Sequence, residues 1–95
     1  MSTADFNSAK ESISSKSFED SKLSTAKQVL DNNCMTSAQV KEVMGLFNFE
    51  NSKLDLAKYA YGKTVDKNNY YKINDAFTFE SSISELDSYI KKSGK

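Results

Sequence analysis

Apolar residues recur along this chain every three or four positions, which is the period of an α-helix, and they do not alternate as they do in a strand. The sequence has three Gly and no Pro, so few residues interrupt the helical pattern. It therefore predicts an all-α protein of about six short helices. We expect these helices at about residues 6–15, 17–30, 36–47, 50–63, 69–77 and from 82 onwards.

Three of the expected helices begin with a residue that can cap the free N–H groups of a first turn. Thr36 is followed three positions later by Gln39, which is the spacing of a capping box, where two side chains satisfy two backbone N–H groups. Ser17 and Ser82 are each followed at the same spacing by an acidic residue. We therefore expect side-chain caps at all three helix starts.

The expected helix at 50–63 differs from the others because it is apolar on nearly all sides. Only Asp55, Lys58 and Gly62 form a polar stripe along it. A helix with this pattern is surrounded by protein, so we expect it at the centre of the fold.

A ten-residue stretch that begins at Phe18 recurs at Phe49 with seven identical positions, and a shorter copy begins at Phe79. The last two copies belong to the motif Phe-x-Phe-Glu, at 47–50 and 77–80, where one helix is expected to end and the next to begin, and we expect each Phe before the helix to pack over its first turn. The offsets of 31 and 30 residues indicate a helix-turn-helix repeat of roughly 30 residues. Because units of this kind stack to bury a shared core, we predict a compact bundle formed by this repeat.

The chain of 95 residues has room for one domain. Residues 1–16 are rich in Ser and are expected to form a weakly ordered N-terminal helix. Residues 17–91 are expected to form the helical repeat domain, and residues 92–95 a disordered tail.

Core and capping residues between positions 17 and 91 form a recurring pattern: Lys22, Leu23, Ala26, Lys27, Asn32, Asn33, Thr36, Ser37, Gln39, Val40, Phe47 to Glu50, Lys53, Leu54, Ala57 to Tyr61, Asp66, Asn69, Tyr70, Phe77, Phe79 and Leu86. This pattern resembles a small all-helical family of domains of unknown function. Members of that family often lie near the C-terminus of bacterial envelope or exported proteins, and they also occur in eukaryotes. The resemblance implies the fold, and it implies no catalytic or binding residue.

The charge composition bears on function. Thirteen acidic residues balance thirteen basic ones, and every basic residue is Lys, with no Arg and no His. The chain thus lacks the usual proton shuttle near neutral pH, the commonest nitrogen ligand of metals and the bidentate clamp for phosphate. We therefore expect neither an enzyme nor a cofactor. A neutral domain without Arg also has little electrostatic attraction for nucleic acid, so we expect none to bind.

The cysteine content and the apolar runs bear on location. Cys34 is the one cysteine, so no disulfide can form within the chain, and small domains without disulfides are typical of a reducing compartment. The first residues have no pattern of an export signal. No apolar run approaches the ~20 residues of a membrane-spanning helix. We expect a cytoplasmic monomer that does not bind membranes.

The segment from 31 to 42 has oxygen-bearing side chains at several positions of the calcium loop of an EF-hand. It departs from that loop because Met35 stands at a ligand position and Thr36 stands where the chain needs Gly to turn. Ordinary turn and cap roles account for the same side chains. A degenerate EF-hand-like calcium-binding domain is therefore our alternative hypothesis, with four ligands: Asp31, Asn33, Ser37 and Glu42.

Tyrosines are the remaining candidates for a contact surface. Tyr59 and Tyr61 face opposite sides of the helix at 50–63. Tyr70 and Tyr71 are adjacent, so not all four rings can point into one core. Rings that pack while their hydroxyls reach water give the same pattern, but Tyr is also enriched at binding sites. We expect a non-catalytic protein-interaction or scaffold domain whose partner-binding residues are Tyr59 and Tyr71.

Overall fold

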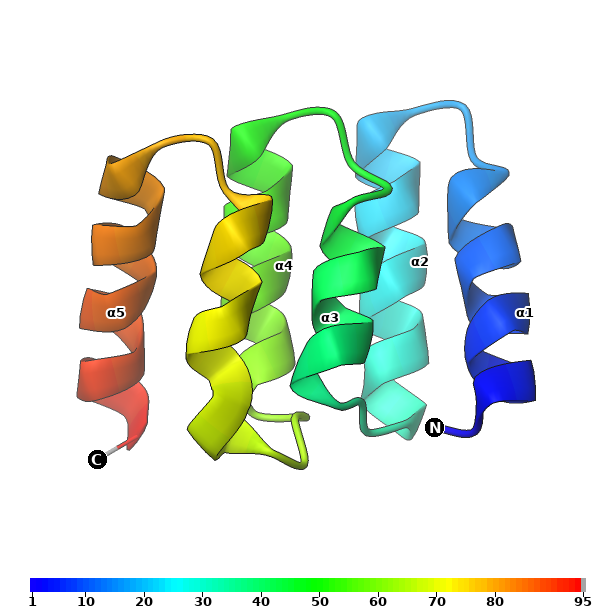
Figure 1. Cartoon of the computed structure of the whole chain (residues 1–95). Coiled ribbons are helices and arrows are strands. Elements are labelled where there is room, and N and C mark those ends of the chain that lie inside the picture. Colours follow the sequence, from blue (N-terminus) through cyan, green and yellow to red (C-terminus); the bar gives the residue numbers. More distant parts are fainter. Residues whose placement is uncertain (95) are drawn as a thin grey trace.

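The computed structural model describes residues 1–94, and every regular element in this range is a helix (Figure 1). The predicted all-α fold of six helices is confirmed. In chain order the elements are α1 (Thr3–Ser14), α2 (Glu19–Asn32), α3 (Ser37–Met44), α4 (Glu50–Tyr61), the 3₁₀ helix η1 (Lys67–Ala76) and α5 (Glu80–Gly94). Among these residues no helix is both long and apolar enough to cross a membrane.

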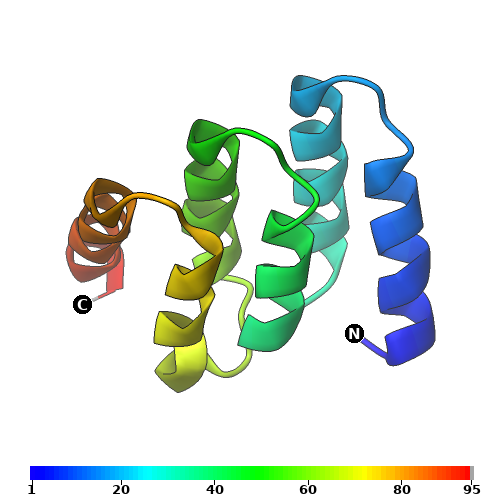
Figure 2. The same cartoon turned by 45° about the horizontal axis from the view of Figure 1, so that its top comes forward.

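The helices form a row of antiparallel pairs. Helices α2, α4 and α5 run in one direction, and α1, α3 and η1 return in the other (Figures 1 and 2). Helix α4 packs against α2, α3, η1 and α5, whereas α1 packs against α2 at one end of the row. The central position expected for the helix at 50–63 is therefore confirmed.

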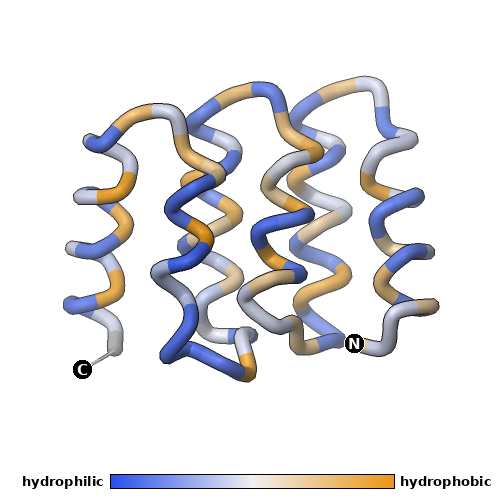
Figure 3. The backbone as a smooth tube through the Cα atoms, viewed as in Figure 1, coloured by the Kyte–Doolittle hydropathy of each residue, from blue (hydrophilic) through white to orange (hydrophobic). Residues whose placement is uncertain are grey.

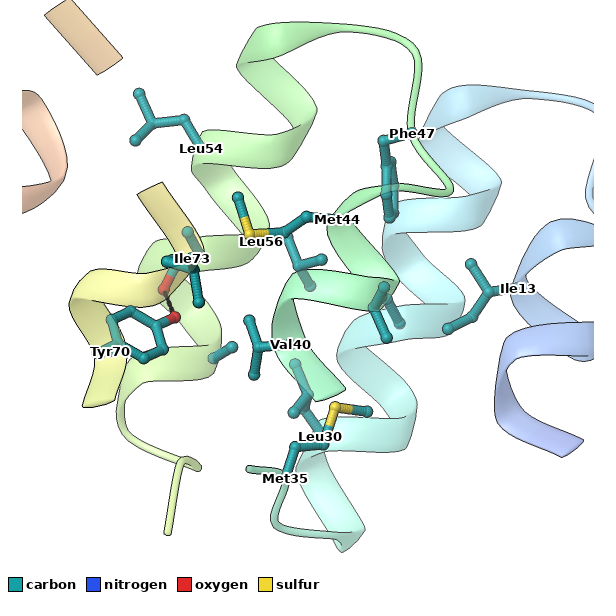
Figure 4. Packing of buried hydrophobic residues seen from close by; sticks show 14 of the residues in the cluster. Ile13, Leu30, Met35, Val40, Met44, Phe47, Leu54, Leu56, Tyr70 and Ile73 are labelled. Atoms are coloured by element: carbon teal, nitrogen blue, oxygen red, sulfur yellow. Dashed lines mark hydrogen bonds between the residues drawn. The ribbon is translucent and has the colours of Figure 1, made fainter. Parts of the chain in front are cut away.

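One apolar cluster runs through the whole row and takes side chains from every helix. Apolar segments recur along each helix and face the neighbouring helices (Figure 3), and the buried side chains meet between α2, α3, α4 and η1 (Figure 4). The cluster continues to α1 through Ile13 and to α5 through Leu86. Its residues exposed by 1% or less are Ile13, Ala26, Leu30, Met35, Val40, Val43, Met44, Leu56, Ala57, Ala60 and Ile73.

The two ends of the chain differ from their expected descriptions. Phe6, Ala9 and Ile13 of α1 are buried against the rest of the domain, so the structure does not separate residues 1–16 from the core. The apolar face of α1 has this effect, despite the many Ser on its other face. Residues 92–94 continue α5 and form no separate tail, while Lys95 lies outside the described residues.

The expected side-chain caps are correct at one helix start of three. The hydroxyl of Thr36 accepts the N–H of Gln39 at 3.1 Å, and the Gln39 side chain accepts the N–H of Thr36 at 3.0 Å. The prediction for Ser17 is wrong, because α2 begins after Phe18 and has no side-chain cap. The prediction for Ser82 is wrong too, since this residue lies inside the first turn of α5.

Carboxylates from a neighbouring helix cap the starts of α4 and α5. Glu19, the first residue of α2, accepts the backbone N–H groups of Asn48 and Phe49 just before α4, at 2.8 and 2.9 Å. Glu50, the first residue of α4, binds the two equivalent N–H groups just before α5. Each acid thus satisfies two free donors of the next helix start.

Lysines one turn further along repeat the same relationship. The ammonium of Lys22 donates to the carbonyl of Leu46 at 3.1 Å, and that of Lys53 donates to the carbonyl of Ala76 at 3.2 Å. Leu46 lies in the connection that leads into α4, and Ala76 is the last residue of η1, just before the connection to α5. Residues that are aligned by the sequence repeat therefore make matching contacts.

The Phe residues directly before α4 and α5 do not pack as expected. Phe49 and Phe79 are exposed, so the prediction that each ring packs over its helix is wrong for these two, and Phe18 before α2 is exposed as well. The Phe two positions before each of the last two joins the core instead, since Phe47 is buried and Phe77 is partly buried against the core.

Candidate functional site

The four side chains of the calcium alternative do not converge. Residue 31 lies in α2 and residues 37 and 42 lie in α3, so the segment is not a single loop. In the part of the chain that the structure describes, no three Asp, Glu, Cys or His side chains form a group that could hold a metal ion. Each candidate ligand has a partner of its own: Asp31 with the Tyr59 hydroxyl, Asn33 with the Val29 carbonyl, Ser37 with Asp66, and Glu42 with the Lys10 ammonium.

Ser37 and Asp66 join the starts of α3 and η1. The buried Ser37 donates its N–H to the Asp66 carboxylate at 2.6 Å and its hydroxyl to the Asp66 carbonyl at 3.1 Å. Asn69 donates to the other carboxylate oxygen at 3.2 Å. The hydrogen bond from the Ser37 N–H, with that from Asn69, holds the pKa of Asp66 below its usual value. These residues therefore have a structural role.

The two connections at this edge of the domain are also paired through their backbones. Met35 donates its N–H to the Lys63 carbonyl at 3.0 Å, and its own carbonyl accepts the N–H of Val65 at 2.9 Å. Met35 and Thr64 thereby form an isolated parallel bridge. This bridge holds the connection between α4 and η1 in place.

All five tyrosines of the chain line two adjoining pockets around the C-terminal half of α4. One pocket, of about 420 Å³, lies between η1 and α5 and contains Tyr61, Tyr70 and Tyr71. The other, of about 480 Å³, lies at the ends of α4 and α5 and contains Tyr59, Tyr61 and Tyr89. Tyr61 and Lys67 belong to both. We call the two pockets together the tyrosine surface.

Tyr70 is the fixed floor of this surface. Its ring is buried, its hydroxyl donates to the carbonyl of Ala57, and burial raises its pKa well above the usual value for a tyrosine. The ring of Tyr61 meets it edge to face, with centroids 5.1 Å apart. Lys67 lies over the Tyr61 ring at 5.6 Å and donates to the Thr64 carbonyl. The shared wall of the two pockets is therefore held in one arrangement.

Tyr59 and Tyr89 occupy matching places on α4 and α5. The ammonium of Lys27 lies 5.2 Å from the centre of the Tyr59 ring, and that of Lys58 lies 5.7 Å from the Tyr89 ring. The Tyr59 hydroxyl donates to the carboxylate of Asp31, and this hydrogen bond raises the pKa of Tyr59. Each ring is thus positioned by the preceding helix of the row.

The two tyrosines predicted as partner-binding residues lie on this surface but in different pockets. Tyr59 is 37% exposed in one pocket and Tyr71 is 66% exposed in the other. The predicted set of partner-binding residues did not include Tyr61 or Tyr89, which also line the pockets. The repeat offset could have identified Tyr89, which stands 30 positions after Tyr59 as Phe79 stands 30 after Phe49.

A comparison with known protein families identifies the family of this helical domain. The model of one family, Domain of unknown function (DUF4476), matches residues 1–90, which is nearly the whole chain. The chain belongs to this family. The DUF4476 match confirms the resemblance to a small helical domain-of-unknown-function family, and it includes α1, in agreement with the buried face of that helix. No curated protein and no solved structure matches this DUF4476 domain.

Proposed function

We propose that this DUF4476 domain is a non-catalytic protein-interaction module and that the tyrosine surface binds its partner. The observation that carries the proposal is the gathering of all five tyrosines on two adjoining pockets. Tyrosine side chains bury a large area at a small cost in rotamer entropy, and they are enriched among the residues that dominate binding energy. The non-catalytic part of the proposal rests on the composition, which has no His and no Arg.

The surface combines a rigid base with accessible rings. Tyr70 is buried and Tyr61 is packed on it, while Tyr71 and Tyr89 are exposed by 66% and 39%. Apolar side chains of α5, among them Leu86, continue the base. A preformed apolar pocket with exposed aromatic edges loses little entropy when a partner side chain enters it.

The charges around the second pocket favour acidic side chains on the partner. Its rim carries the ammonium groups of Lys58, Lys63 and Lys67 and the carboxylate of Asp31. That carboxylate is bound by Tyr59, and Lys58 pairs with Glu85 at 2.9 Å. The remaining lysines give the rim a positive field, which selects partners by charge.

We also propose that the helix pairs are units of one repeat. The support is the set of matching contacts: two acids bind the N–H groups before the next helix, and two lysines bind backbone carbonyls 24 and 23 positions further along the chain. Stacked repeats use an extended side of the stack for binding. The tyrosine surface spans the last two units in this description.

A capture experiment with matched variants tests the proposed function. The purified domain is immobilised, and bound proteins from cells that express it are quantified by mass spectrometry. A protein recovered by the wild type is expected to fall about 30-fold for a Tyr71→Ala/Tyr89→Ala variant, the loss typical of hot-spot residues. A Lys16→Ala variant, which alters a residue away from the pockets, serves as the control. Equal recovery by the folded double variant would refute the tyrosine surface as the binding site.

A further inference from the structure

Three phenylalanines stand exposed at one edge of the domain. Phe18, Phe49 and Phe79 directly precede α2, α4 and α5, and their exposed fractions are 73%, 63% and 58%. Their exposure shows that these rings are not part of the core. They do not cap a helix either, since α2 and α4 have no side-chain cap. Repeated exposure of a large apolar ring at an equivalent position marks an interaction site. We call these three residues the phenylalanine row.

The helix packing fixes the spacing of the row. Helices α2, α4 and α5 start along the same edge and lie side by side in this order (Figures 1 and 2). Packed helices are about 8–10 Å apart, so successive Phe positions are separated by about 9 Å. The tyrosines of α4 and α5 lie near the other end of these helices, about 15 Å along each axis. The row therefore lies at the opposite end of these helices from Tyr59 and Tyr89.

The backbone beneath the row is held in place. The N–H of Phe49 is bound by the Glu19 carboxylate at 2.9 Å, and that of Phe79 by Glu50 at 3.1 Å. The rings therefore project from a fixed edge, and a partner that contacts several of them at once does not have to order the chain first.

The edge is acidic as well as aromatic. Each Phe is followed by a glutamate, while Lys22 and Lys53, in the first turns of α2 and α4, each donate to a backbone carbonyl. Asp20 adds a further carboxylate next to Phe18. Aromatic faces attract cations, and the neighbouring carboxylates attract them too. The complementary partner is basic.

We propose that the phenylalanine row binds a basic, proline-rich segment of a partner protein in the polyproline II conformation. This conformation has three residues per turn and a rise of about 3.1 Å, so every third side chain faces one way at intervals of about 9 Å. That interval matches the step of the row. A partner helix repeats every 5.4 Å or so and a strand about every 6.6 Å, and neither matches it. Rows of aromatic side chains are the surfaces on which such segments dock.

In this arrangement, arginine or lysine side chains at every third position each lie over one phenylalanine ring and beside the carboxylate that follows it. The prolines between them hold the segment extended before binding, which lowers the entropy cost. The site is distinct from the tyrosine surface, so either proposal can fail while the other stands.

The probe is a fluorescein-labelled peptide of about nine residues in which Pro-Pro-Arg occurs three times, so that its arginines recur at the polyproline II period. Its control has the same composition with the three arginines adjacent. Fluorescence anisotropy is measured against the whole protein at low ionic strength. The regular peptide is expected to bind saturably and about tenfold more tightly than the control peptide.

A Phe18→Ala/Phe49→Ala/Phe79→Ala variant is expected to bind the regular peptide at least about tenfold more weakly. It should fold, since all three rings are exposed, and its melting midpoint checks this. Tyr71→Ala is the matched control, because it removes an exposed ring elsewhere and should leave binding unchanged.

Several outcomes would overturn the proposal. Equal affinity for both peptides would show attraction by charge alone, and unchanged binding by the triple variant would place the peptide elsewhere. Absence of saturable binding would remove the site. Sedimentation showing a wild-type dimer that the triple variant lacks would assign the row to a second copy. Flotation with neutral vesicles that depends on the three rings would assign it to a lipid surface.

Discussion

The carboxylate of Glu50 accepts the backbone N–H of Phe79 at 3.1 Å, although the two residues are 29 positions apart in the chain. It also accepts the N–H of Thr78 at 3.1 Å. Glu50 begins α4 and Phe79 directly precedes α5, so the first residue of one helix supplies the cap of the next. This acid acts on two helix starts at once, because its charge also lies at the positive end of α4.

We predict that Glu50→Gln lowers the free energy of unfolding by about 1–2 kcal/mol, because a hydrogen bond to a charged acceptor contributes more than one to a neutral group. Urea denaturation followed by circular dichroism measures the change. Glu80→Gln is the matched control, since Glu80 follows Phe79 as Glu50 follows Phe49 but makes no hydrogen bond or ion pair within residues 1–94. Its effect should be within about 0.5 kcal/mol. Equal losses in both variants would contradict the prediction.

Acid should destabilise the domain through Asp66. Hydrogen bonds from Ser37 and Asn69 lower the pKa of Asp66 from its usual value of 3.8. A carboxyl with a lowered pKa in the folded state contributes stability that is present above the unfolded pKa and is lost as the pH falls through the folded pKa. The unfolding free energy should therefore decrease below about pH 4.

Asp66→Asn should flatten this decrease, and unfolding curves at a series of pH values measure it. Asp75→Asn is the control, because the Asp75 side chain is 81% exposed. Glu50 contributes to the same loss of stability at low pH. Partial burial raises its pKa, but hydrogen bonds from Ser82, Phe79 and Thr78 and the charge of Lys53 outweigh this effect, so that its pKa is lowered. An equally steep decrease in unfolding free energy at low pH in the Asp66 and Asp75 variants would count against a role for Asp66.

The first helix should contribute fully to stability. Ile13 of α1 has no exposed surface, so Ile13→Ala should cost about 2–4 kcal/mol through lost burial and the cavity left behind. Ser12→Ala changes an exposed neighbour and should have little effect. Thermal and urea unfolding measure both. If Ile13→Ala were as mild as Ser12→Ala, α1 would not be part of the cooperative unit.

Alkaline pH should reveal the burial of Tyr70. Its pKa is raised in the folded state by burial, so its contribution to stability is full below the unfolded pKa near 10.0 and is lost as the pH rises toward the folded pKa. Tyr70→Phe should lose about 1 kcal/mol at neutral pH with the hydrogen bond to Ala57, and should lose less further stability above pH 10. Tyr71→Phe is the exposed control. In an ultraviolet titration of phenolate absorbance, the last tyrosine to ionise should be missing in Tyr70→Phe and present in Tyr71→Phe.

Features that depend on neighbours along the chain could be predicted from the sequence. The three- and four-residue spacing identified the helices, the nearly uniform apolar character of α4 placed it at the centre, and Thr36 with Gln39 formed the expected cap. Each of these depends on residues within one or two turns, where the geometry of a helix is regular.

Features that depend on contacts with a neighbouring helix pair could not be predicted from the sequence. Whether Ser82 or a carboxylate 29 positions away satisfies the start of α5 is decided by packing, and the acid is the stronger acceptor. The pockets that unite the tyrosines are lined by side chains of α4, η1 and α5, which no local pattern brings together. The helix expected at about 69–77 is the 3₁₀ helix Lys67–Ala76, and its Asn and Asp residues, weak α-helix formers, accompany this tighter form.

The short reach of the side-chain contacts has a kinetic consequence. Within the described residues no hydrogen bond joins positions more than 38 apart, and the acid, lysine and backbone links between neighbouring helices mostly join positions 23 to 32 apart. Ordering such a chain closes only short loops, each rewarded as soon as it closes. Folding should therefore begin at any adjacent helix pair and spread outward, with a rate in the millisecond range or faster.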